Sequence, residues 1–465
     1  MNKFLLTGII TVFLAGLTCQ AQLFSSKKNI STTGNYPLSI ESGNLNNDDY
    51  PDILVGTIDN TVEWYKNNGN DSFTKQSNIA TNLSVVRDLA IVDLDGDLDN
   101  DIVAIANLGN KLVWYENLGN GNFGAEQVIS SSFDRPIALK TGKIDGNNTI
   151  DIAVVEYDGN QITWFSNLGF GSFSSANIID APSVIKKPRD LDMADFDEDG
   201  DLDVVVAFYQ TKNVFLYYND LVQTGSVSFN NIDVVASAIS GLASVSFADV
   251  DGDNQLDVLT VGGSSNTLNW YKSAGGGSYS THSLAPANST PSFAVVEDLD
   301  MDNKKDILVS YASGSETIDE ISWFEGSSPG VFLSEQLIDN SQDDVLFTIN
   351  DFDKDGDMDI ASIAFNQNSL NWFENSTYSS SLGVDDFNSN EFKHFYNTNT
   401  KELTLKSYSM PMDNAALYNI LGQNVLNKTL SLTEEKIDLS KLNKGIYIAQ
   451  ISFDNVVKTI KFVKQ

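Results

Sequence analysis

The sequence predicts an all-β fold in which a seven-bladed β-propeller is followed by a small C-terminal β-sandwich. Three observations predict it. An acidic nine-residue segment recurs seven times at intervals of 49 to 54 residues, which marks a repeat array with one supersecondary unit per repeat. Each copy leads into a short β-branched run and then an aromatic strand, with no helical periodicity between copies. From residue 379 onward the charge pattern changes, which indicates a second module.

The acidic segments, called loops one to seven below, punctuate every repeat. Runs such as "IVAIA" and "VVVAF" follow them and predict buried strands, because they are short, β-branched and free of proline. About ten residues later all six tryptophans occupy one slot, and only the fourth repeat has Leu216 there instead. A strand before the loop, one after it, the tryptophan strand and an outer strand give four strands per repeat, the unit of a propeller blade. The loops begin at Asn44, Asp93, Lys143, Asp195, Asp249, Asp298 and Asp351.

The seventh repeat lacks an outer strand of its own before the serine-rich stretch "STYSSS". The segment 24–30, which precedes loop one, lines up with an outer strand of the next repeat. We therefore expect segment 24–30 to pair into the last blade, which would remove a free sheet edge.

The spacing within the loops predicts calcium sites. Side-chain oxygens fall at loop positions one, three, five and nine, and the carbonyl of position seven adds another; hard oxygen ligands at this spacing suit Ca²⁺. We expect about six sites that fix the turn between two strands and have no catalytic role. The predicted ligands are Asn44, Asn46, Asp48 and Asp52; Asp93, Asp95, Asp97 and Asp101; Asp195, Asp197, Asp199 and Asp203; Asp249, Asp251, Asp253 and Asp257; Asp298, Asp300, Asp302 and Asp306; and Asp351, Asp353, Asp355 and Asp359.

Two loops depart from this pattern. Loop one begins with two asparagines and is expected to bind calcium more weakly. In loop three Lys143 replaces the first ligand, so its ammonium is expected to stand in for the metal and the site to be empty.

Over residues 23–378 these repeats resemble the FG-GAP/VCBS propellers, which include the head of integrin α-subunits. The resemblance implies calcium loops on one face of the disc and ligand binding on the other. The fourth repeat departs from it by lacking the tryptophan, and the third by Lys143.

Composition bounds the cellular context. The formal net charge is −35 and the pI is near 4.1, which argues against a nucleic-acid partner. Residues 1–21 read as a signal peptide, with an apolar run too short for a comfortable membrane span, and no later segment predicts a transmembrane helix. The single cysteine, Cys19, lies within that peptide, so the mature chain is expected to have no disulfide.

The C-terminal region carries a net charge of about +1, whereas the rest of the mature chain has 17 basic and 54 acidic residues. Its "YNILGQ", "LNKGIYI" and lysine-rich last strand resemble the type A sorting domain of the type IX secretion system of Bacteroidetes, although the Tyr-Pro-Asn-Pro of that family is missing. The resemblance implies an export signal that is commonly removed after passage. The expected organisation is signal peptide 1–21, propeller 22–378, linker 379–390 and sorting domain 391–465.

Three arginines, Arg87, Arg135 and Arg189, are the candidate ligand-binding residues. Each precedes the acidic loop of a consecutive repeat by six to eight residues, which places them at the channel mouth opposite the calcium loops. They could form salt bridges between blades, or they could bind an anionic glycan, which arginine recognises bidentately. The tryptophans are expected to pack between blades, with sugar stacking as the alternative.

Catalytic signatures are sparse. The two histidines, His282 and His394, have no obvious partners, and no nucleophile or phosphate-loop motif is present. The sequence thus predicts a secreted or cell-surface, calcium-binding, monomeric adhesion module for a glycan. A protein-binding scaffold and a propeller polysaccharide lyase are the alternatives.

Overall fold

The computed structural model describes residues 23–32, 36–69, 71–284, 286, 290–312, 320–341, 344–377, 392–397, 400–407, 411–419, 423–453 and 456–464. The predicted signal peptide and linker lie outside these ranges. The chain divides into two compact units, Met1–Ser379 (unit 1) and Ser380–Gln465 (unit 2). In the described part, no helix is both long and apolar enough to span a bilayer.

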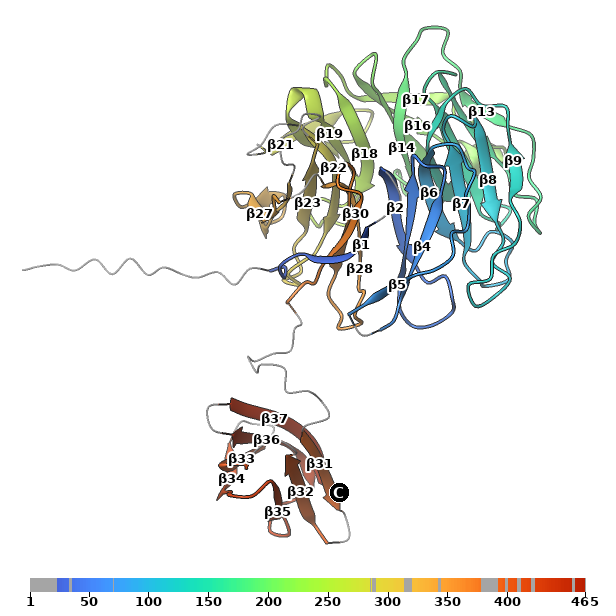
Figure 1. Ribbon diagram of the computed structural model, residues 1–465. Helices are drawn as coiled ribbons and strands as arrows, with labels where there is room; N and C mark the ends of the chain where they lie inside the picture. Colours follow the sequence, from blue (N-terminus) through green and yellow to red (C-terminus); the bar gives the residue numbers. More distant parts are fainter. Residues whose placement is uncertain are drawn as a thin grey trace, which may run out of the picture. The chain divides into compact units, whose positions relative to one another are not determined.

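Unit 1 contains, within the described residues, seven four-stranded antiparallel sheets (Figure 1). The first strands are β2 (Pro37–Gly43), β6 (Val86–Val92), β10 (Pro136–Gly142), β14 (Pro188–Ala194), β18 (Leu242–Ala248), β22 (Pro291–Glu297) and β28 (Asp344–Asn350). The second strands are β3 (Asp52–Thr57), β7 (Asp101–Ala106), β11 (Asp151–Glu156), β15 (Asp203–Phe208), β19 (Asp257–Gly262), β23 (Asp306–Tyr311) and β29 (Asp359–Ala364).

The third and outer strands complete each sheet. The third strands are β4 (Val62–Asn67), β8 (Lys111–Tyr115), β12 (Gln161–Phe165), β16 (Asn213–Tyr218), β20 (Thr267–Ser273), β24 (Ile321–Phe324) and β30 (Ser369–Phe373). The outer strands are β5 (Phe73–Lys75), β9 (Gln127–Ser130), β13 (Asn177–Asp180), β17 (Asn231–Ala236), β21 (Tyr279–Leu284), β27 (Gln336–Asp339) and β1 (Lys28–Thr32). Short additions are α1 (Leu221–Thr224), the 3₁₀ turn η1 (Gly263–Ser265) and the hairpin β25 (Gly326–Ser328) with β26 (Val331–Phe332).

The first strands of successive sheets contact one another in chain order, and β28 of the last sheet contacts β2 of the first. The second strands are buried along their whole length, as their continuous apolar runs predicted. Repeated four-stranded sheets with inner strands in cyclic contact have the form of propeller blades. The all-β class predicted from the repeats is therefore confirmed.

The N-terminal segment joins the last sheet, as the sequence predicted. Strand β1 pairs antiparallel with β30, and Phe24 forms an isolated bridge with Asn375. Phe24 is 2% exposed and packs in the core shared by the sixth and seventh sheets. Lys27 reaches Asp339 of the sixth sheet at 2.9 Å, so this segment also links two neighbouring sheets.

The tryptophans pack between sheets. All six are at most 7% exposed, and Leu216, which replaces one of them, is fully buried. A Cβ on Gly121 of the second sheet would lie 2.2 Å from the ring of Trp64 in the first, so the hairpin needs glycine there at φ 73°. The packing role, rather than sugar stacking, is what the structure supports.

Unit 2 has a three-stranded and a four-stranded antiparallel sheet. One apolar cluster joins residues of both, such as Leu405 of the first and Ala449 of the second. The strands are β31 (Phe392–Asn397), β32 (Glu402–Ser407), β33 (Asn414–Asn419), β34 (Asn424–Thr429), β35 (Glu434–Asp438), β36 (Gly445–Phe453) and β37 (Val456–Lys464).

Candidate metal loops and channel site

The last residue of every acidic loop is an aspartate that starts the second strand of its sheet and is at most 1% exposed. In loop two, Asp101 Oδ2 accepts the Leu94 N–H at 2.9 Å and Oδ1 accepts the Asn117 N–H at 2.7 Å. Burial is the main cause that raises the pKa of Asp101 to about 6. Both oxygens accept backbone N–H groups in the same way in Asp52, Asp151, Asp203, Asp306 and Asp359.

This ninth position therefore anchors the loop to the third strand of its own sheet, a role that the ligand spacing alone did not reveal. Whether its carboxylate also contacts a metal stays a prediction.

An asparagine three residues after the tryptophan slot links neighbouring sheets. The side-chain amide of Asn117 donates to the Leu45 carbonyl of the preceding loop at 3.0 Å, and that of Asn167 donates to the Leu94 carbonyl at 2.6 Å. Asn67, Asn219 and Asn375 make the equivalent bonds. The recurrence of asparagine at one repeat position was the sequence signal for this role.

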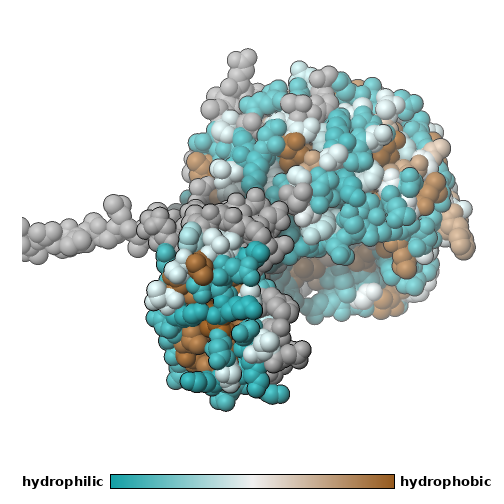
Figure 2. Space-filling view, turned by 60° about the horizontal axis from the view of Figure 1, so that its bottom comes forward, coloured by the Kyte–Doolittle hydropathy of each residue, from teal (hydrophilic) through white to brown (hydrophobic). Residues whose placement is uncertain are grey.

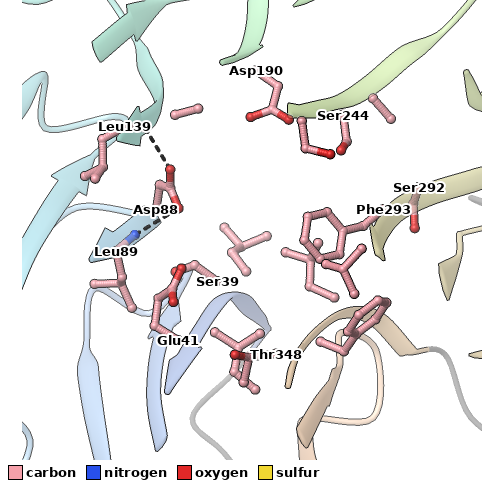
Figure 3. A pocket seen from close by; sticks show the side chains of 18 of the residues that line it. Ser39, Glu41, Asp88, Leu89, Leu139, Asp190, Ser244, Ser292, Phe293 and Thr348 are labelled. Atoms are coloured by element: carbon pink, nitrogen blue, oxygen red, sulfur yellow. Dashed lines mark hydrogen bonds between the residues drawn. The ribbon is translucent and has the colours of Figure 1, made fainter. Parts of the chain in front are cut away.

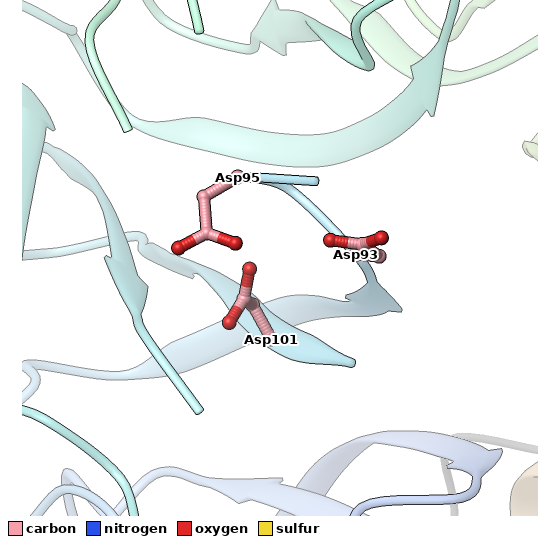
Figure 4. Close-up of side chains that lie close together, drawn as sticks. All are labelled: Asp93, Asp95 and Asp101. Atoms are coloured by element: carbon pink, nitrogen blue, oxygen red, sulfur yellow. The ribbon is translucent and has the colours of Figure 1, made fainter. Parts of the chain in front are cut away.

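Within the described residues, carboxylates of five loops converge. Oxygens of Asp93, Asp95 and Asp101 lie within 4.8 Å of one another, and Figure 4 shows these side chains facing a common space. The first and third loop positions belong to every cluster. The third member is position nine in loops two and five, and position five in loops four, six and seven. The other clusters are Asp195–Asp197–Asp199, Asp249–Asp251–Asp257, Asp298–Asp300–Asp302 and Asp351–Asp353–Asp355.

These clusters fit a hard divalent cation. The Oδ1 atoms at the first or third loop position are buried without a hydrogen-bond partner in Asp195, Asp251, Asp298 and Asp351. Burial first, and then the neighbouring Asp355, raise the pKa of Asp353 to about 6. Buried acceptor oxygens beside like charges are unfavourable until a cation binds. Oxygen-only donor sets suit Ca²⁺, which such a loop would hold through its first, third and fifth carboxylates.

Loops one and three fit a cation poorly. In loop one the Asn46 side-chain amide donates to Asp52 Oδ2 at 3.0 Å, and the Asn44 amide donates to the Asp48 carbonyl. An amide N–H that points into the loop takes the place of a ligand oxygen. Fewer oxygens therefore face the interior of this loop than the predicted ligand set of Asn44, Asn46, Asp48 and Asp52 requires.

In loop three the expected ammonium contact is wrong. Lys143 Nζ donates to Asn148 Oδ1 at 2.8 Å, not to an aspartate. The Asn147 amide instead donates to Asp145 Oδ2 at 3.2 Å and to the Asn167 carbonyl at 2.9 Å. A short neutral side chain from within the loop reaches its centre, and the longer lysine turns outward.

The first strands enclose a channel cavity of about 690 Å³. Its lining is charged over the first four sheets and carries hydroxyl and apolar groups over the last three. Figure 3 shows Asp88 and Glu41 on one side of the cavity and Phe293 on another. Phe293 packs edge-on against Phe347 at 5.2 Å between ring centroids. Such a cavity offers both polar and apolar contacts to a ligand.

Arg87 and Arg189 line this cavity near the starts of β6 and β14, at the strand ends opposite the acidic loops. Within the described part of the chain, neither guanidinium forms an ion pair with a carboxylate. Burial first, and then the nearby Arg189, lower the pKa of Arg87. Asp88 and Asp190 link sheets through backbone instead, since they accept N–H groups of Leu139 and Val245 at 2.8 and 3.0 Å. The salt-bridge reading of these arginines is therefore wrong.

Arg135 lies near the other two arginines but outside the cavity lining. After burial and Arg189, it contributes to the lowered pKa of Arg87, and the Tyr157 ring beneath it is 6.4 Å from Tyr209, the ring beneath Arg189. Arg135 precedes β10 with φ 60°, pairs with Asp158 at 3.3 Å and lies over the Tyr157 ring at 5.3 Å. It does not line the channel cavity. Arg135 stands one residue before β10, whereas Arg87 and Arg189 are the second residues of β6 and β14. A ligand-binding role for Arg135 at the channel mouth stays a prediction.

Glu41 predicts a pH dependence of stability. Burial is the main cause that raises its pKa to about 7, nearby Asp88 adds to the rise, and Lys140 opposes it. Because the folded pKa is raised, this carboxyl stabilises the fold at low pH, and the stabilisation is lost as pH rises toward 7. We expect Glu41→Gln to change the free energy of unfolding, measured with urea, by a value that is about 1–2 kcal/mol more stabilising at pH 8 than near pH 5.5. Parallel pH profiles for the two proteins would contradict this assignment.

The face drawn in Figure 2 is mostly hydrophilic, with apolar side chains scattered singly or in small groups. Among the exposed apolar residues, Leu98 and the neighbouring pair Leu168 and Phe170 lie in loops.

Comparison with known proteins agrees with this geometry. A family profile described as an FG-GAP-like repeat matches residues 44–104, 93–154, 143–206, 195–260 and 249–309. The chain belongs to the FG-GAP-like repeat family. A second profile, the secretion system C-terminal sorting domain, matches residues 396–465. This FG-GAP-like repeat protein is therefore exported by the type IX system to the cell surface or the medium.

No curated protein matches the chain. Among solved structures, a lectin from Agrocybe aegerita that recognises non-reducing terminal N-acetylglucosamine is similar, with 17% identity and a TM-score of 0.50 over 66% of this chain and 81% of the lectin. Two crystals of BBS1N in complex with ARL6DN, soaked with mercury and with lead, match at 12% and 13% identity. Their TM-scores are 0.53 and 0.51, and the matches cover 76% of this chain and 96% and 97% of theirs. At these identities the likeness concerns the fold alone.

Proposed function

We propose that this protein is a secreted, monomeric, non-catalytic adhesion module: a calcium-stabilised seven-bladed propeller that binds an anionic glycan at its channel mouth. Its expected organisation is the propeller over 22–378, the linker over 379–390 and a sorting β-sandwich over 391–465. Calcium would hold the acidic loops at one end of the inner strands. The ligand would bind at the other end, where Arg87 and Arg189 stand.

The observation that carries the ligand class is the pair of arginines without carboxylate partners in a propeller dominated by acidic residues. Arg189 lies over the Tyr209 ring at 5.9 Å, and Tyr209 is 40% exposed. A guanidinium beside an exposed aromatic ring offers a bidentate contact for a uronate carboxylate and a flat surface for the sugar ring. Repulsion by the acidic surroundings would exclude anions that make no such contact.

Affinity electrophoresis of the mature protein tests the proposal against neutral and uronate-rich polysaccharides. We expect the uronate polymers to retard the protein. Arg87→Gln or Arg189→Gln should weaken this binding about tenfold or more, because one charge-assisted contact contributes about 1.5–3 kcal/mol. Lys212→Gln should leave the binding unchanged. Lys212 is an exposed lysine in the turn after β15, so its loss changes the net charge equally. Retardation that is indifferent to both arginines would contradict the site, and binding to surface proteins only would favour a scaffold.

A polysaccharide lyase is the second candidate, because Glu41 is a partly exposed carboxyl in the same cavity and its pKa is raised to about 7. A base with such a pKa is suited to proton abstraction at neutral pH. Incubation with the retarding polymer distinguishes the two functions, since a lyase generates the ultraviolet absorbance of an unsaturated uronate and an adhesion module does not.

A further inference from the structure

The residue two positions after the tryptophan slot stands at the end of each third strand, beside the acidic loop of the same sheet. In the fifth sheet Lys272 Nζ lies 2.5 Å from Asp251 Oδ2 and 2.7 Å from Asp253 Oδ2, the third and fifth loop positions. In the first sheet Lys66 Nζ lies 3.2 Å from Asp48 Oδ2. Across the seven sheets the residues at this position are Lys66, Glu116, Ser166, Tyr218, Lys272, Glu325 and Glu374.

The charge at this position differs between sheets. Sheets two, six and seven carry a glutamate at the position where the lysines of sheets one and five contact their loops. Glu116 and Glu325 therefore place a negative charge where Lys66 and Lys272 place a positive one. Glu374 is paired with Lys28 at 2.7 Å, so sheet seven adds no competing cation of its own at this position.

Sheets three and four carry neutral side chains there. The Ser166 hydroxyl donates to Asp145 Oδ2 at 2.5 Å and helps to close the hydrogen-bonded interior of loop three. The Tyr218 hydroxyl turns to Asp233 at 2.9 Å, away from loop four. Loop four keeps the buried Asp201, 4% exposed, whose Oδ1 has no hydrogen-bond partner.

We infer that Lys272 and Lys66 are built-in cations that replace calcium in loops five and one, so that calcium binds only in loops two, four, six and seven. This inference rests on the proposed calcium-stabilised propeller. It revises the expectation of about six ions. Three carboxylates of loop five do converge, but the ammonium of Lys272 already contacts one of them, Asp251, and the neighbouring Asp253.

Physical competition supports this division of the loops. A tethered ammonium is present at an effective concentration of the order of millimolar or higher, whereas extracellular calcium modules bind with dissociation constants of about 10⁻⁴ to 10⁻³ M. Calcium would have to displace a lysine that is already paired with two carboxylates, and the freed ammonium would then repel the ion. A glutamate at the same position removes that competitor. Lys304 of loop six contacts a single loop carboxylate, Asp302, whereas Lys272 contacts two.

Calcium counting on the mature, full-length protein tests this inference. Equilibrium dialysis of chelator-treated protein should give one ion for each of loops two, four, six and seven at saturation. Lys272→Met, which keeps the length of the side chain and removes its charge, should bind one more ion. The control Lys212→Met removes a lysine in the turn after β15, at the strand end opposite the acidic loop, and should leave the number of bound ions unchanged.

A second variant keeps the test valid if Lys272→Met fails to fold. Glu325→Lys places a lysine beside loop six and should lower the number of bound calcium ions by one. A wild type with six ions, or an unchanged number in both Lys272→Met and Glu325→Lys, would overturn the inference. A wild type that binds no calcium would instead overturn the calcium part of the proposed function, so the two failures are distinguishable.

Discussion

A chain that lacks residues 22–32 is expected to lose cooperative folding of unit 1. The deletion removes β1, which supplies the outer strand of the last sheet, and Phe24, which fills the core between the sixth and seventh sheets. The backbone groups of β30 would then form an open edge, the kind of surface that pairs with other chains. The loss should approach the whole free energy of unfolding, about 5–15 kcal/mol for a typical domain, and should appear as aggregation in size-exclusion chromatography.

A single substitution measures the same closure more gently. Phe24→Ala should destabilise the protein by about 3–5 kcal/mol in urea unfolding, as expected for a buried phenylalanine, while exposed Ser26→Ala should change it by less than about 0.5 kcal/mol. Equal stability of the Phe24→Ala and wild-type proteins would mean that the N-terminal segment does not close the last sheet.

Asp101→Ala is expected to destabilise the protein by about 2–5 kcal/mol whether or not calcium is present. It leaves the buried N–H groups of Leu94 and Asn117 without their acceptor, and each unsatisfied group costs about 1–3 kcal/mol. The matched change Asp95→Ala should leave the stability in chelator nearly unchanged and should remove only part of the gain on adding calcium. Urea unfolding of both variants in calcium and in chelator makes the comparison.

The contrast would separate anchoring from ligation within one loop. If Asp101→Ala lost its effect in chelator, the ninth position would act through the metal and not through the backbone. If Asp95→Ala were as damaging in chelator as Asp101→Ala, the first half of the loop would be structural as well.

Much of the fold follows from the repeat pattern, because strand, loop and tryptophan recur in phase seven times. The sequence also predicted the partner of the orphan N-terminal strand, since segment 24–30 matches an outer strand. By contrast, the anchoring role of Asp101 was hidden, because an aspartate that accepts backbone N–H groups and one that binds calcium occupy the same position in the spacing.

The limits at the site have the same origin. Lys272 lies 15 residues after the end of loop five in sequence, and only antiparallel pairing brings it beside Asp251. Arg135 precedes its loop by eight residues and Arg87 by six, so Arg135 lies just before the first strand of its sheet and Arg87 lies within its own. Spacing along the chain identifies which oxygens can converge. The positive charges beside them come from other strands, and the spacing does not reveal how those strands pair or turn.

Thermal unfolding of the mature protein in calcium, in magnesium and in chelator tests the central claim most directly. At a calcium concentration 10 to 100 times the dissociation constant, each site should add about 1.4–2.7 kcal/mol, so several sites together should raise the Tm by about 10 °C or more. Magnesium should give little of this gain, because it demands octahedral geometry and gives up its water reluctantly. An unchanged Tm on chelation would contradict a calcium-stabilised propeller.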